Sequence, residues 1–126
     1  GVQTCALPIL IQSAMGKGPM LRYFDVSMIT NPEFQEYALE IAKIHKIPVQ
    51  VSVRSGGGTN GMAITQVQGA PTIVVGIPVR YAHTPHCYVD FQDYQAAKEL
   101  VIQLIKNLDA DKIQALVQPL SKEWNK

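Results

Sequence analysis

The sequence has few cysteines, no run of basic residues and no long apolar stretch. Each of these features argues against one class of protein. Two cysteines among 126 residues do not make a disulfide framework, so a reducing cytoplasm is the expected compartment. The eleven Lys and Arg residues are scattered, without a basic run or interleaved aromatics, which argues against a nucleic-acid partner. No apolar run approaches the roughly 20 residues that cross a bilayer, so no membrane partner is expected.

Length and composition predict one soluble domain, with a net charge of +1 and 47% hydrophobic residues.

The first nine residues need a separate explanation. GVQTCALPI is the letter-for-letter translation of a common sequencing-adapter end, GGA GTT CAG ACG TGT GCT CTT CCG ATC. We therefore expect residues 1–9 to be a translated adapter artefact, in which case Cys5 and Pro8 have no functional role. A genuine amino-terminal segment is the alternative.

Strands and helices are predicted to alternate along most of the chain. The turn at residues 16–19, GKGP, leads into an apolar strand at about residues 20–24. Asn31 followed by Pro32 is typical of a helix start, and Pro48 ends the helical pattern. The apolar face of this helix is expected to contain Phe34, Tyr37, Ala38, Ile41 and Ile44, and Val49, Val51 and Val53 alternate as the next strand.

The later part of the chain is predicted to be helical. Asp90 can cap one helix, and Asp109 or Asp111 can open a short last helix that ends at Pro119. Trp124 is expected to cover apolar surface or to be a loose end. The alternation as a whole is typical of the α/β class, with a mostly parallel sheet covered on both faces. The buried stripe of the longer helix is expected to contain Tyr94, Ala97, Val101, Leu104, Ile105 and Leu108.

The glycine-rich turn after the second predicted strand has the composition of a binding site. Gly56, Gly57 and Gly58 allow a close backbone approach or a positive φ. Thr59 and Asn60 place short polar side chains where this turn ends. We therefore expect the turn to contact a ligand.

A second candidate region follows an apolar run at residues 71–79, which is typical of a strand buried on both faces. Arg80 and His83 come directly after this run, so they are expected at a strand end, where open α/β sheets bind ligands. Asp25 also follows a predicted strand. It could be a ligand or a base, although an acidic residue there more often accepts hydrogen bonds from nearby backbone amides.

His83 has more than one interpretation when its neighbours alone are considered. A lone histidine is more often a hydrogen-bonded surface or core residue than a metal ligand. His86 and Cys87 extend the pattern to His-x-x-His-Cys, which would suit a self-contained zinc site. Against that site, Pro85 stiffens the turn and no other pair of ligands occurs elsewhere in the chain.

Four motifs between about Gly16 and Leu108 carry a family resemblance: GKGPMLRYFD, MITNP, IPVQVSVRSGGGTNG and GAPTIVVGIPVRYAHTP. In this order and at about this spacing they are similar to the carboxyl-terminal third of the glutamyl-aminopeptidase family. These are cocatalytic metallo-aminopeptidases that include deblocking aminopeptidases and carry an old endoglucanase label. Most relatives have aspartate where this chain has Asn60, which removes a charge beside the site.

The resemblance implies a fold and a set of site residues. Residues 10–126 would be the carboxyl-terminal part of a catalytic domain with a three-layer α/β/α, zinc-exopeptidase-like, mostly parallel sheet. The amino-terminal strands, the dimerisation insert, the catalytic glutamate and the other metal ligands would lie upstream. The family binds two divalent metal ions, zinc or cobalt, and His83 matches the last ligand. A substrate-binding role is implied for Gly57, Gly58, Thr59, Asn60 and Arg80.

The resemblance also implies an activity. Two metals would lower the pKa of a bound water and polarise the scissile carbonyl, while a glutamate acts as general base. The expected enzyme is a cytoplasmic homo-oligomer that hydrolyses amino-terminal residues from peptides, and this chain is expected to be inactive alone. One alternative is a metallo-deacylase or dipeptidase of the same scaffold, which the GIPVRYAHTP motif fits less well. Another is a non-catalytic module that binds a small ligand at the glycine turn.

Overall fold

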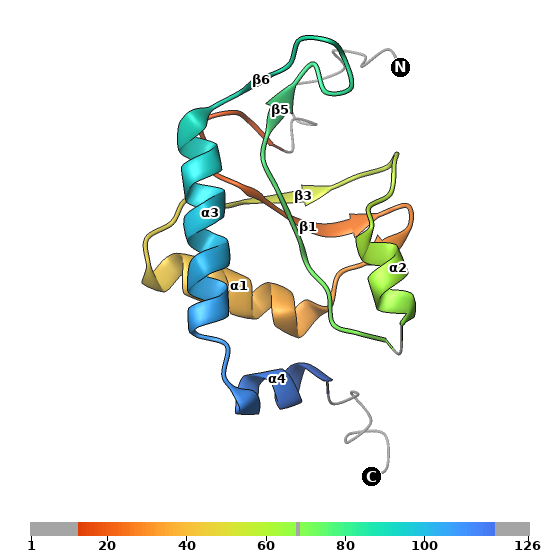
Figure 1. The fold of residues 1–126 in the computed structure, drawn as a ribbon, viewed down its shortest axis with the longest axis vertical. Helices are drawn as coiled ribbons and strands as arrows, with labels where there is room; N and C mark the ends of the chain where they lie inside the picture. The colour runs from red at the N-terminus through yellow and green to blue at the C-terminus, as the bar shows by residue number, and fades with distance from the viewer. Residues whose placement is uncertain (1–12, 68, 118–126) are drawn as a thin grey trace.

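The structure, a computed structural model, describes residues 13–67 and 69–117, and the predictions for residues 1–9, Pro119 and Trp124 lie outside this part. The described residues form a four-stranded sheet, a two-stranded hairpin and four helices (Figure 1), which confirms the α/β class. The elements are β1 (Met20–Asp25), β2 (Met28–Ile29), α1 (Pro32–Ile44), β3 (Gln50–Val53), α2 (Gly61–Gln66), β4 (Val74–Gly76), β5 (Val79–Arg80), β6 (Tyr88–Val89), α3 (Phe91–Lys106) and α4 (Ala110–Val117).

The sheet is built around β1. This strand pairs in parallel with β3 and antiparallel with β4 and β2. Since β3 and β4 pair with the same residues of β1, they lie along its opposite edges. Among the described residues the sheet is therefore mixed, with one parallel pair.

An extra residue interrupts the regular alternation of β1. Arg22 lies opposite Ser52 and Phe24 lies opposite Val53, so Tyr23 is a bulge with no partner in β3. In a regular strand, residues three apart face opposite sides of the sheet. The bulge removes that alternation, so that Arg22 and Asp25 share one side.

Helix α1 begins where the sequence predicts. The Asn31 side chain accepts a hydrogen bond from the Phe34 backbone N–H at 2.8 Å, and Pro32 occupies the first turn. The predicted face is confirmed at Tyr37, Ala38 and Ile41, which are buried. The prediction is wrong for Ile44, which is 61% exposed because it lies at the edge of the buried stripe.

The core forms where α1 and α3 pack together over one face of β1. Leu21 is the residue of β1 that enters this core, and Leu100 and Leu104 enter it from α3. Tyr37 of α1 donates its hydroxyl to the Leu104 carbonyl at 2.9 Å, so its one polar atom is satisfied. The core therefore fixes both helices on the same side of the sheet.

Helix α3 is capped by Asp90, as predicted, through a 2.8 Å hydrogen bond from the Gln92 backbone N–H. Its buried residues are Asp93, Ala97, Leu100 and Leu104, so the predicted stripe is confirmed at Ala97 and Leu104 and missed Asp93 and Leu100. The predicted members Tyr94, Val101 and Ile105 lie about a quarter-turn away and are exposed. Among the described residues, this stripe is covered by α1 and, at Asp93, by the turn at residues 16–19. Asp109 opens α4, as predicted, by accepting from the Lys112 N–H at 2.8 Å.

Strand β3 shows the reverse of the expected burial. Ser52 is buried, whereas Val51 and Val53 are each 46% exposed. The valines lie on the same side of the sheet as Leu21, but α1 and α3 do not reach over them. Phe24 and Ile29 extend the same uncovered surface at the end of β1.

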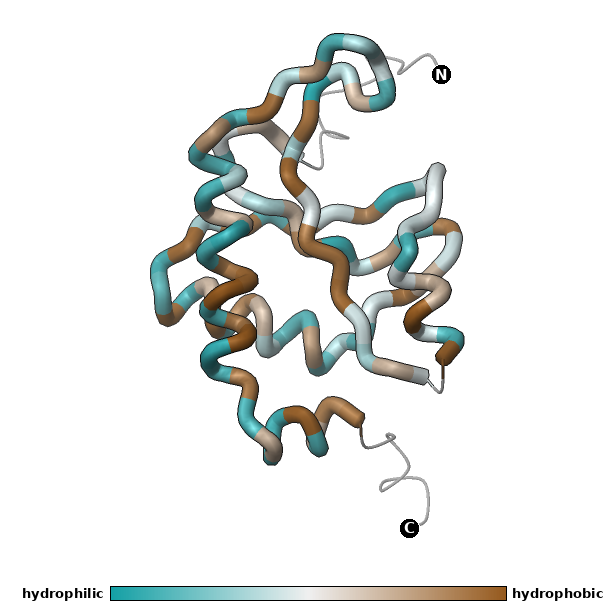
Figure 2. Tube along the Cα trace, in the orientation of Figure 1, coloured by the Kyte–Doolittle hydropathy of each residue, from teal (hydrophilic) through white to brown (hydrophobic). Residues whose placement is uncertain are grey.

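The apolar run at residues 71–79, drawn in Figure 2 as brown stretches separated by pale ones, does not form one buried strand. β4 contains three half-buried residues, and β5 belongs to a separate hairpin. Pro78 lies between them and cannot donate to a strand ladder, which explains the break. Across residues 13–67 and 69–117, every helix is too short or too polar to span a membrane.

The first turn of the described chain is fastened to α3 by Asp93. Both carboxylate oxygens accept hydrogen bonds, from the backbone N–H of Gly16 and of Gly18, each at 2.7 Å. Gly18 has a φ of +89°, and a Cβ there would lie 2.1 Å from the Pro48 carbonyl oxygen. The GKGP turn is therefore a structural turn held by a buried carboxylate.

Replacing Asp93 by alanine is expected to lower the free energy of unfolding by about 2–4 kcal/mol, because two backbone N–H groups lose their acceptor. Urea unfolding followed by circular dichroism measures this difference. Asp111→Ala, which removes an exposed acidic residue of α4, is the matched control and should stay within about 0.5 kcal/mol of the original chain. Equal losses for the two variants would contradict this role of Asp93.

Candidate functional site

The glycine turn lies between β3 and α2 and is docked against the turn that joins β1 to β2. Gly57 has a φ of +76° and is exposed, as a residue facing a ligand would be. A Cβ on Gly58 would lie 2.7 Å from the Ser27 Oγ, and a Cβ on Gly61 would lie 2.6 Å from the Met28 Sδ. A side chain at either position would displace Ser27 or Met28, so the glycines on both sides of Thr59 and Asn60 permit this close approach.

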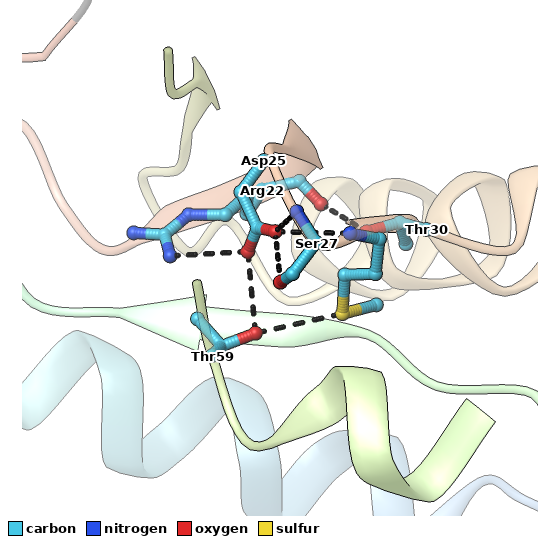
Figure 3. A network of polar contacts seen from close by, with 6 residues as sticks. Arg22, Asp25, Ser27, Thr30 and Thr59 are labelled. Carbon is cyan, nitrogen blue, oxygen red and sulfur yellow. Dashed lines mark hydrogen bonds and ion pairs between the residues drawn. The ribbon is translucent and has the colours of Figure 1, made fainter. Parts of the chain in front are cut away.

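Asp25 holds the β1–β2 turn together (Figure 3). Its Oδ1 accepts hydrogen bonds from the Ser27 backbone N–H at 2.8 Å, from the Ser27 hydroxyl, and from the Met28 backbone N–H at 3.0 Å. The residue is fully buried. The interpretation of Asp25 as an acceptor for nearby backbone amides is confirmed.

The second oxygen of Asp25 faces the glycine turn. Oδ2 accepts a hydrogen bond from the Thr59 hydroxyl at 3.2 Å and lies 3.7 Å from Nη1 of the buried Arg22 (Figure 3). That last distance is too long for a hydrogen bond, so Arg22 acts through its charge. The hydrogen bonds from Ser27 lower the pKa of the Asp25 carboxyl, with further lowering from Met28 and Thr59, while burial acts in the opposite direction.

Asn60 is exposed, next to the half-buried Thr59. It occupies the position before α2, but its side chain makes no capping hydrogen bond there. The backbone carbonyls of Thr59 and Asn60 accept from the N–H groups of Met62 and Ile64 at 3.2 and 3.4 Å. The carboxamide of Asn60 is thus available to a ligand, at a place set by its neighbours.

Arg80 and His83 lie on the β5–β6 hairpin. Arg80 is exposed, and its guanidinium lies 5.4 Å from the centroid of the Tyr81 ring, within the range of a cation–π contact. Tyr81 and Tyr88 stack edge to face across the hairpin, with centroids 6.1 Å apart. Two aromatic rings therefore support the base of the turn that carries His83.

His83 is exposed and has a φ of +64°, a conformation that is uncommon for a residue with a Cβ. The Thr84 hydroxyl lies within hydrogen-bond distance of the carbonyls of Tyr81 and His86, at 2.7 and 2.9 Å, and closes this turn. The structure shows no hydrogen bond to the His83 imidazole within the described residues. The ring is therefore accessible to an external partner.

The described residues do not form a complete metal site. In residues 13–67 and 69–117, no three His, Cys, Asp or Glu side chains come together closely enough to hold a metal ion, so His83, His86 and Cys87 do not form the self-contained zinc site. An exposed neutral imidazole is nevertheless a suitable single ligand for a borderline metal such as zinc. His83 fits a metal only if other ligands come from outside these residues.

The structure separates the predicted site residues into two groups. The turn with Gly57, Gly58, Thr59 and Asn60 lies at the end of β1, whereas Arg80 and His83 lie on the hairpin, apart from it in Figure 1. Sequence reasoning missed Ser27 and Arg22, which complete the network around Asp25. The Asp-x-Ser spacing could have indicated Ser27. For Arg22, the bulge that turns it toward Asp25 left no sequence signal.

Known proteins resemble this chain over most of its length. The sequence profile described as M42 glutamyl aminopeptidase matches residues 8–100, which include the glycine turn and the hairpin. The lysyl aminopeptidase of Pyrococcus furiosus is 34% identical over 97 residues, which cover 75% of this chain and 27% of that protein. The chain spans less than a third of the length of the curated relatives that it matches.

Solved structures share the fold. The TET aminopeptidase of a marine-sediment archaeon, Thaumarchaeota archaeon SCGC AB-539-E09, superposes with a TM-score of 0.81 at 39% identity, covering 82% of this chain and 30% of that one. The TET1 peptidase of Pyrococcus horikoshii, described as assembling into a tetrahedron or a large octahedral shell, superposes with a TM-score of 0.73. It is 27% identical, over 82% of this chain and 31% of that one.

The lowered pKa of Asp25 predicts a pH-dependent contribution to stability. The ionised carboxylate should stabilise the fold fully above the ordinary aspartate pKa of about 3.9. This stabilisation should decrease as the pH falls below that value and through the lower pKa that Asp25 has in the folded chain. Urea unfolding of the original chain and of Asp25→Asn, between about pH 6 and about pH 3, should therefore give a difference that shrinks toward acid pH.

The exposed Asp111 provides the control for this experiment, since Asp111→Asn should change the free energy of unfolding little. A difference between the original chain and Asp25→Asn that stays constant down to about pH 3 would show that the carboxylate charge does not stabilise the fold.

Proposed function

The chain belongs to the M42 glutamyl aminopeptidase family, and we propose that it is part of the catalytic domain of a metal-dependent enzyme that removes amino-terminal residues from peptides. The match of the family profile across both the glycine turn and the hairpin is the observation that carries this proposal. The length of the relatives supports a longer parent protein, because this chain spans 27–31% of the relatives and structures compared above.

We assign His83 as one ligand of a divalent metal, zinc or cobalt. Its exposed imidazole, free of hydrogen bonds within the described residues, is compatible with this role. The remaining ligands and the general base would come from other parts of the parent protein. When bound, divalent metals supply Lewis-acid activation of a carbonyl and of a water molecule.

The glycine turn and Arg80 would bind the peptide. Gly57 and Gly58 leave the backbone open to a close approach, and the exposed Asn60 has an unused carboxamide that can donate and accept hydrogen bonds. Arg80 is exposed on the hairpin, where its charge is available to a peptide carbonyl or carboxylate. The residues on this chain would therefore position the substrate.

The parent protein would be a cytoplasmic homo-oligomer. The resemblance to a TET peptidase that is described as forming closed shells supports a multimeric enzyme. The near-neutral charge of the chain and its scattered basic residues give no support to nucleic acid as a partner. Size-exclusion chromatography with light scattering of the parent enzyme would test the assembly.

The 126-residue chain by itself should have no aminopeptidase activity, because one histidine cannot hold a catalytic metal ion. Assays with glutamyl and lysyl p-nitroanilides, with and without added zinc or cobalt, measure this. Metal-dependent hydrolysis that is well above the buffer rate and co-purifies with the chain would overturn the assignment of the missing ligands.

In the parent enzyme, His83→Ala should lower metal content and kcat together, because it removes a ligand while leaving the core intact. Asn60→Ala and Arg80→Ala are the comparisons, and they should change KM or kcat with metal content unchanged. Elemental analysis and steady-state kinetics distinguish these outcomes. A His83→Ala enzyme with full metal content and near-normal kcat would refute the ligand assignment.

A further inference from the structure

We propose that Asp25 is a positioning residue, which sets the place of the glycine turn, and so of Asn60, through its hydrogen bond to Thr59. The functional meaning of this role rests on the proposed function above. The structural claim stands on the contacts between the β1–β2 turn and residues 58–61.

The two oxygens of Asp25 act on different segments. Oδ1 accepts from Ser27 and Met28, its neighbours in sequence, and closes the β1–β2 turn. Oδ2 accepts from the hydroxyl of Thr59, which is 34 residues away along the chain. One carboxylate thus connects the end of β1 to the segment that begins α2.

The glycine turn lies close against the β1–β2 turn. Gly58 and Gly61 approach Ser27 and Met28 so closely that a Cβ on either would lie under 3.0 Å from a side-chain atom. The Thr59 hydroxyl also lies 3.5 Å from the Met28 Sδ. Two glycines therefore let residues 58–61 lie close against the β1–β2 turn, and the Thr59–Asp25 hydrogen bond holds them there.

The contact between Thr59 and Asp25 also sets the positions of Asn60 and of the first turn of α2. The Thr59 carbonyl accepts from the Met62 N–H, and the Asn60 carbonyl accepts from the Ile64 N–H. Movement of Thr59 away from Asp25 would displace both acceptors and turn the exposed Asn60 side chain in another direction. The amides of Met62 and Ile64 therefore report on whether the turn is held.

Arg22 explains why the acceptor is a carboxylate. Its buried guanidinium lies on the same side of β1, 3.7 Å from Oδ2, and its Nε has no hydrogen-bond partner among the described residues. An amide at position 25 could present N–H groups toward this cation and lose the acceptor for Thr59. Substitution of Thr59 tests the contact more cleanly, because it leaves the Arg22–Asp25 pair intact.

The decisive comparison is between Thr59→Val, which removes the hydroxyl and keeps the shape, and Thr59→Ser, which keeps the hydroxyl. Amide hydrogen exchange of the 126-residue chain, read by NMR, should be roughly two- to tenfold faster at Met62 and Ile64 in Thr59→Val, the effect of losing one hydrogen bond. In Thr59→Ser, exchange at these amides should return to within about twofold of the original rates.

Two controls separate positioning from general destabilisation. The amides of Ser27 and Met28, which bond to the other oxygen of Asp25, should keep their rates in Thr59→Val. Thr65→Val removes a hydroxyl that bonds only within α2, to the Met62 carbonyl, and should leave the Met62 and Ile64 amides within about twofold. Equal acceleration at all four amides, or no acceleration in Thr59→Val, would overturn the proposal.

The parent enzyme provides the functional comparison. Thr59→Val should lower kcat/KM for peptide substrates several-fold with metal content unchanged, and Thr59→Ser should restore it. If the parent enzyme has no aminopeptidase activity, the proposed function fails while the exchange result still decides the role of Asp25. If Thr59→Val loosens the turn but leaves kcat/KM unchanged, the turn does not position the substrate and the positioning role is refuted.

Discussion

The burial of two unlike faces of β1 is the constraint on which the rest of the structure depends. On one side Leu21 is fully buried and joins α1 and α3 in the apolar core. On the other side the bulge at Tyr23 brings Arg22 and Asp25 together, with Asp25 also fully buried. A buried carboxylate needs hydrogen-bond donors as well as a nearby cation, and the donors to Asp25 come from the β1–β2 turn and from the glycine turn.

This arrangement connects stability to the candidate site. The core holds β1 between β3 and β4, and β1 in turn supplies the carboxylate that receives Thr59. The hairpin with Arg80 and His83 is exposed, and the contacts found for it among the described residues are its own: the β5–β6 pairing, the Tyr81–Tyr88 pair and the Thr84 hydroxyl. One half of the site is therefore held by a buried network, and the other half projects from the fold.

Local signals in the sequence were sufficient to predict the helix caps, because a cap depends on one side chain and the backbone next to it. Asn31, Asp90 and Asp109 each accept the backbone hydrogen bond that their capping positions predict. Periodicity was less reliable, because it shows that a helix has an apolar face but not which neighbour covers it. In α3, Tyr94, Val101 and Ile105 fit a helical stripe as well as Leu100 does, yet only the stripe facing α1 is buried.

By itself the sequence determined the α/β class, the starts of α1 and α3 and the family, and it favoured the acceptor role of Asp25, because caps, turns and motifs depend on residues that are near one another in the chain. Only the tertiary structure decided that Ser52 is buried while Val51 and Val53 are exposed, that Pro78 divides the apolar run, and that Thr59 meets Asp25. The burial of β3 and the Thr59–Asp25 contact depend on which segments pack together across about 30 residues or more, and a strand bulge at Tyr23 that reverses the alternation leaves no mark in the local pattern. The break at Pro78 has a local cause, but which parts of the run on either side of it join the sheet or the hairpin is decided by their strand partners.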